Sequence, residues 1–198
     1  MTTIPSGQVR ELRDVSGAPM MDCKKALDET AGDMEKAMEW LRKKGIASAA
    51  KKAGRTAADG SVFSYIHHNG KVGVLLEVNC ETDFVARSEP YQQFCKDVCL
   101  HIASMHPQWV RREDVPAVLV EKEREIALAQ VDPKKPEEIQ EKMVEGRVAK
   151  FFAETCLMEQ AFVKDDKQTI EQLRTSLVGK LGENIVVRRF ARFEVGGE

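Results

Sequence analysis

The sequence lacks the features that mark membrane-bound, secreted and nucleic-acid-binding proteins. No uninterrupted apolar run approaches the ~20 residues that a membrane-spanning helix needs. The first ten residues are polar and lack the apolar segment of a secretory signal. A formal net charge of −2 excludes a global basic field that would collect nucleic acid or an anionic membrane. We therefore expect a cytoplasmic protein that binds neither nucleic acid nor a membrane.

Cysteine is scarce and irregularly placed. The chain has five cysteines, and no two of them form a C-x-x-C pair, which argues against a disulfide framework and a structural zinc site. Cys95 and Cys99 lie one helical turn apart, with His101 and His106 nearby, so a metal site is conceivable there. Both cysteines also fall on an apolar helical stripe, where cysteine behaves as a small hydrophobic residue. We expect buried cysteines, a reducing compartment and no bound metal.

Motifs that support catalysis are also missing. The sequence has no G-x-x-x-x-G-K-[ST] loop for nucleotide phosphates, no H-E-x-x-H metal motif and no G-x-S-x-G nucleophile motif. His67 and His68 adjoin each other at an expected hairpin, without an obvious nucleophile beside them. We therefore expect a protein that is not an enzyme and that needs no cofactor.

What is present is ordinary globular composition, with 42% hydrophobic and 31% charged residues. Residues 1–53 carry apolar side chains at helical spacing in three short segments divided near Gly17 and Gly32, which predicts a three-helix module. Residues 54–60 are small and polar and are interpreted as a linker.

Residues 61–198 are predicted to form an α+β core domain, with helices packed over an antiparallel sheet. Two β-rich runs flank Asn69–Gly70, a pair typical of a type I′ hairpin turn. The pattern predicts strands at 62–68, 71–79 and 184–195, and helices from 88 to Pro107, at 116–130, at 136–156 and at 168–181.

Residues 42–55 contain six basic residues and no acid. One interpretation is a solvated helix face that leads into the linker. The other is a strip that binds phosphates, although no aromatic residues alternate with the charges as stacking platforms would.

The segment Thr82-Asp83-Phe84-Val85-Ala86 places an acid and a large aromatic side chain between a strand end and a helix start. Phe84 could fold under this turn into the core. It could equally be an exposed anchor for a partner protein, because aromatic residues dominate interface hot spots. The residue pattern alone leaves both alternatives open.

Three motifs carry a resemblance to a known family. They are VGVLLEVNCETDFVA at 72–86, VRELR at 9–13 with MMDCKKAL at 20–27, and EKMVEGR at 141–147 followed by Phe162-Val163. In this order, from about residue 8 to residue 195, they closely resemble translation elongation factor Ts. That family is the guanine-nucleotide exchange factor for the GTPase elongation factor Tu.

The resemblance implies roles for individual residues. The module at 1–53 is similar to the family's ubiquitin-associated-type module, which docks on the GTPase. Met20 and Met21 match contact residues there, and we expect at least one of the two to be core. Asp83 and Phe84, with Thr82 and Val85 beside them, match the segment that enters next to the partner's magnesium and phosphates. His67 matches a position that also approaches the GTPase.

The chain resembles the short members of the family, with one sheet unit and no room for the helical hairpin that longer members insert. Such members dimerise through the core, so a homodimer through residues 61–198 is expected. Because position 191 is Ala191 rather than a cysteine, packing alone would hold this dimer. Two rival hypotheses remain, namely a ubiquitin-type or RNA-binding adaptor built on the N-terminal module, and a thiol or metal enzyme built on the cysteines and histidines.

Overall fold

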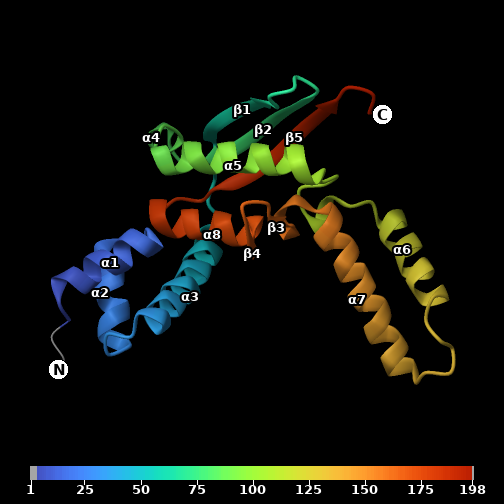
Figure 1. The fold of residues 1–198 in the computed structure, drawn as a ribbon, viewed down its shortest axis with the longest axis horizontal. Coiled ribbons are helices and arrows are strands. Elements are labelled where there is room, and N and C mark those ends of the chain that lie inside the picture. The colour runs from blue at the N-terminus through green and yellow to red at the C-terminus, as the bar shows by residue number, and fades with distance from the viewer. Residues whose placement is uncertain (1–3, 198) are drawn as a thin grey trace. The chain divides into compact units, whose positions relative to one another are not determined.

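The structure is a computed structural model and describes residues 4–197 (Figure 1). Three N-terminal helices precede an antiparallel sheet and further helices, which confirms the predicted α+β class. The first three residues of the polar N-terminal segment lie outside the described residues. Among residues 4–197, none of the helices has both the length and the hydrophobicity required to span a membrane.

The chain forms two compact units, each assembled from segments that are distant in sequence. The first unit contains the chain up to Ser61 together with residues 78–94 and 172–186. The second contains residues 62–77, residues 95–171 and the chain from Val187 onward. The predicted module (1–53), linker (54–60) and core domain (61–198) do not coincide with these two units. The division remains a prediction about which parts of the chain carry which function.

The three N-terminal helices are α1 (Ser6–Ser16), α2 (Met20–Glu29) and α3 (Met34–Lys52). Gly17 ends α1 with a φ of 65°, a conformation that glycine adopts without steric cost. The Asp33 carboxylate accepts a hydrogen bond from the backbone N–H of Lys36 at 3.0 Å and so caps α3. The helices enclose a small core of buried apolar residues: Val9, Leu12, Cys23, Ala26, Leu27 and Ala37.

Helix α3 continues through most of the basic stretch, because the Ala-rich segment after Ile46 favours a helix. Two of its lysines pair with acids: Lys43 lies 2.9 Å from Glu39, and Lys44 lies 2.5 Å from Asp22. These contacts favour the solvated helix face over a phosphate-binding strip.

The main sheet contains β1 (Asp59–Ile66), β2 (Val72–Cys80) and β5 (Val186–Glu194), with β2 between the other two. The turn between β1 and β2 differs from the predicted type I′. The N–H of Gly70 bonds to the carbonyl of His67 at 2.8 Å, and Gly70 has a φ of 68° whereas Asn69 keeps a negative φ. The Asn69 side chain accepts a bond from the N–H of Lys71 at 3.0 Å, which favours a type I turn followed by a left-handed glycine.

Helices α5 (Glu89–Met105), α6 (Ala117–Ala129), α7 (Glu137–Thr155) and α8 (Ile170–Leu181) agree with the predicted helices to within about two residues. In the second unit, α6 and α7 lie side by side as a helical hairpin (Figure 1). The hairpin has a core of its own: Val115, Ala127, Val131, Val144, Val148, Phe152 and Cys156. This hairpin corresponds to the two helices predicted at 116–130 and 136–156.

Several short elements escaped prediction. They are α4 (Asp83–Ala86), the 3₁₀ turns Arg112–Asp114 and Leu157–Glu159, and the small antiparallel pair β3 (Ala161–Phe162) and β4 (Asp165–Thr169). Each is too short for a hydrophobic period to be recognised.

Candidate functional site

Residues 82–86, called the contact turn below, form one helical turn at the end of β2. Thr82 has extended backbone angles, and its Oγ1 accepts a hydrogen bond from the N–H of Val85 at 3.4 Å, which caps α4. Because α4 is a single turn, its side chains point in different directions. Phe84 is 82% exposed, whereas Val85 is 5% exposed. The hypothesis that Phe84 folds into the core is wrong, and Val85 is the apolar side chain that the turn buries.

Asp83 lies on the exposed side of the contact turn. Its carboxylate forms an ion pair with Arg87 at 2.8 Å, one turn further along the chain. Because both side chains are exposed, this pair contributes little to stability, and a partner could displace Arg87 at low cost. The contact turn therefore presents an aromatic ring next to an accessible carboxylate.

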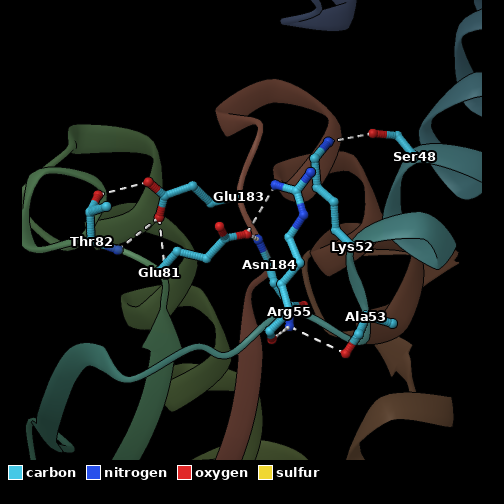
Figure 2. Close-up of polar contacts among 8 residues, drawn as sticks. All are labelled: Ser48, Lys52, Ala53, Arg55, Glu81, Thr82, Glu183 and Asn184. Atoms are coloured by element: carbon cyan, nitrogen blue, oxygen red, sulfur yellow. Dashed lines mark hydrogen bonds and ion pairs between the residues drawn. The ribbon is translucent and has the colours of Figure 1, made fainter.

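A carboxylate from a distant segment holds the contact turn in place. Glu183, between α8 and β5, accepts hydrogen bonds from the backbone N–H groups of Glu81 at 3.0 Å and Thr82 at 3.1 Å (Figure 2). It also accepts one from the Thr82 hydroxyl at 2.7 Å. Sequence reasoning missed Glu183, because no local pattern links it to a residue so far away in the chain.

The same segment also binds the residues that directly follow α3. The amide of Asn184 donates to the carbonyls of Ala53 at 3.4 Å and Arg55 at 2.9 Å. Glu81 accepts a hydrogen bond from the backbone N–H of Asn184 at 2.7 Å and lies 3.6 Å from the Arg55 guanidinium. Figure 2 shows these residues converging from the segment after α3, the end of β2 and the segment that precedes β5.

Met20 and Met21 are the first two residues of α2, and neither belongs to the core of the three helices. Met20 is 39% exposed and Met21 is 71% exposed. The expectation that at least one of them is core is therefore wrong. Both methionines offer adaptable apolar surface to a partner.

His67 belongs to the second unit, where it directly follows β1. Its Nδ1 lies 2.9 Å from the Tyr65 hydroxyl, and its ring lies 4.2 Å from that of His68. His67 is half-buried, and its backbone N–H donates to the carbonyl of Val72 within the hairpin. These contacts give His67 a structural role in the hairpin.

The cysteines do not have the properties of reactive thiols. All five are buried. Burial raises the pKa of Cys80 to about 11 and that of Cys99 to about 12. A catalytic thiol needs a lowered pKa, so this structure gives no support to the thiol-enzyme hypothesis. Within residues 4–197, no three or more His, Cys, Asp or Glu side chains are grouped to hold a metal ion.

Comparison with known proteins places these features in a family. The model of the family described as Elongation factor TS matches residues 46–196. The chain is 57% identical to elongation factor Ts of Geobacter sulfurreducens over 195 residues, which cover 98% of this chain and 90% of the relative. It is 59% identical to elongation factor Ts of Anaeromyxobacter sp. strain K over 197 residues, or 99% of this chain and 90% of the relative. This chain belongs to the elongation factor Ts family, whose members serve in the elongation phase of protein synthesis.

Proposed function

We propose that this protein is a guanine-nucleotide exchange factor that binds elongation factor Tu and promotes the release of GDP. The observation that carries the proposal is the contact turn, where Phe84 is 82% exposed on a backbone that Glu183 holds in place. An exposed aromatic ring on a fixed turn is the kind of residue that anchors a protein interface.

The proposed mechanism is linkage between two binding equilibria. A factor that binds the nucleotide-free GTPase more tightly than the loaded GTPase must weaken nucleotide binding by the same ratio. We place Phe84 and Asp83 beside the partner's magnesium and phosphate site. Thr82 would contribute by capping α4, the helical turn that carries both residues. Disturbing the magnesium ion weakens the hold on the nucleotide's phosphates. The factor then needs no catalytic group, no cofactor and no nucleotide pocket of its own.

The N-terminal helices would provide a second contact. We propose that residues 1–53 are a ubiquitin-associated-like module that docks on the GTPase through Met20 and Met21, with residues 54–60 as the linker. His67, on the hairpin of the core domain, would be an additional contact. Two contacts on one chain raise the effective concentration of each for the partner.

We further propose that two copies of the chain associate through residues 61–198. The outward side of the main sheet carries a set of exposed apolar side chains, called the outer apolar patch: Val62, Ile66, Leu75, Phe193 and Val195. Four of the five line one groove. A second copy could cover this patch by packing alone, and the buried cysteines would not take part. The five cysteines, all of them among the described residues, form no disulfide bond, which fits a protein of the cytoplasm.

The direct test mixes this protein with elongation factor Tu that carries a fluorescent GDP and an excess of unlabelled GDP. Release of the labelled nucleotide should accelerate with the concentration of this protein and reach a plateau. Bovine serum albumin at the same concentration controls for non-specific effects. A release rate that does not depend on the concentration of this protein would disprove the proposed exchange activity.

A further inference from the structure

The way helix α8 ends determines the position of the Glu183 side chain. Gly182 follows that helix with a φ of 78°, and its N–H bonds to the carbonyl of Val178 at 2.9 Å. This left-handed glycine turns the chain out of the helix, and the next side chain, Glu183, leaves toward the contact turn.

The Glu183 carboxylate uses both oxygens on the contact turn. Oε2 accepts the backbone N–H groups of Glu81 and Thr82, and Oε1 accepts the Thr82 hydroxyl. The hydroxyl has one proton, and it points toward Glu183. Its lone pairs therefore remain free to accept the N–H of Val85, the bond that caps α4.

The contact is reciprocal. Glu183 reaches the backbone at the end of β2, and the Glu81 carboxylate reaches back to the N–H of Asn184. Both carboxylates thus satisfy backbone donors on the opposite segment, and these charge-assisted bonds are stronger than bonds between neutral groups. The bonds fix the backbone that precedes Phe84, although the ring itself contacts solvent.

We propose that Glu183 is a positioning residue for nucleotide exchange: it holds the contact turn in the conformation that presents Phe84 to the GTPase. This inference rests on the proposed function and deepens it. The physical reason is preorganisation, because a turn that is already ordered does not lose conformational entropy when it enters the partner. A loosened turn would lose that entropy at the step that expels GDP.

Three variants separate the effect of side-chain length at position 183 from the effect of the carboxylate charge. Glu183→Ala removes every bond to the turn. Glu183→Asp keeps the charge but is one methylene too short to reach it. Glu183→Gln keeps the length and one acceptor oxygen. The matched control is Glu125→Ala, which removes an exposed carboxylate on α6.

The first measurement is GDP release from elongation factor Tu over a range of factor concentrations. We expect the Ala and Asp variants to lower the plateau rate by about tenfold, because three bonds to the turn are lost. The half-saturating concentration should change by less than about twofold, since docking through the N-terminal module is untouched. The Gln variant should lie between wild type and Ala, and the control should match wild type. An Asp variant with the wild-type plateau would overturn the proposal.

The second measurement is independent of the GTPase. Amide hydrogen exchange of the segment 81–86 should accelerate by at least about tenfold in the Ala and Asp variants. Unchanged protection in this segment would overturn the proposal, even if the plateau rate fell. A wild-type protein that does not release GDP would instead refute the proposed function, and the hydrogen exchange would still decide whether Glu183 orders the turn.

The third measurement is a double-mutant cycle with Phe84→Ala. If Glu183 acts through the contact turn, Glu183→Ala should reduce the plateau by less than about twofold when Phe84 is already absent. A general loss of stability would instead multiply the two effects, and that result would contradict a positioning role. Thermal melts accompany each variant; if the Ala variant does not fold, the Asp and Gln variants carry the same comparisons.

Discussion

The backbone N–H of Val163 donates to Nδ1 of His101 at 3.2 Å, which assigns the proton of this buried imidazole to Nε2. Nε2 lies 2.9 Å from the Gln160 side-chain oxygen and donates to it. Protonation of Nδ1 would place two donors face to face. His101 is therefore a neutral residue that joins α5 to the segment around β3, and it has no role in the proposed exchange reaction.

This arrangement predicts a pH-dependent stability. Desolvation by burial lowers the pKa of His101 below its usual 6.5, although the bond to Gln160 opposes the shift. The stability that depends on neutral His101 is present above the unfolded-state pKa near 6.5 and is lost as the pH falls below it. One such group contributes at most about 1.4 kcal/mol per pH unit. Urea unfolding at pH 7.5 and pH 5.5 should show a smaller loss for His101→Gln than for wild type; equal losses would refute this assignment.

Replacing Phe84 should separate exchange from stability. Because the ring is exposed, Phe84→Ala should change the melting temperature by less than about 2 °C but reduce GDP release by about tenfold or more. The matched control, Phe162→Ala, removes a buried ring and should cost roughly 3–5 kcal/mol of stability. Circular dichroism melts and release kinetics measure both properties. Full exchange activity in Phe84→Ala would show that the ring is not an anchor.

Replacing Met21 should affect binding more than the plateau rate. Met21→Ala removes an exposed side chain, so we expect an unchanged melting temperature and a half-saturating concentration about fivefold higher. Met158→Ala, the control, removes a buried methionine and should destabilise the fold by about 2–5 kcal/mol. Titration of elongation factor Tu with each variant measures the binding effect. An unchanged half-saturating concentration would exclude Met21 from the docking contact.

The outer apolar patch predicts the state of association. Light scattering at micromolar concentration should give twice the chain mass of 22.2 kDa, with or without dithiothreitol. Phe193→Glu places a charge within the patch and should give a monomer that melts as wild type does. Val118→Glu, at an exposed apolar position on α6, should remain a dimer. A monomeric wild type, or a dimer that dithiothreitol dissociates, would contradict packing through this face.

In the N-terminal helices, the sequence pattern predicted where each helix ends, but it did not predict whether Met20 and Met21 are buried. The divisions predicted near Gly17 and Gly32 depend on interactions within a few residues, and the structure confirms both. Whether a methionine at the start of α2 is covered depends on which helix packs beside it. The same limit applies to the hairpin turn, where the Asn69 side chain selected a turn type that the residue pair alone did not specify.

The sequence by itself determined the helices and strands longer than about eight residues, because their hydrophobic periods and end signals are local, and its motifs determined the family. Only the tertiary structure decided that Phe84 is exposed and Val85 buried, since both placements satisfy the same local pattern. It alone paired Glu183 with Thr82 across 101 residues of chain. A long-range hydrogen bond depends on how the chain folds back on itself, and no residue near either partner encodes it.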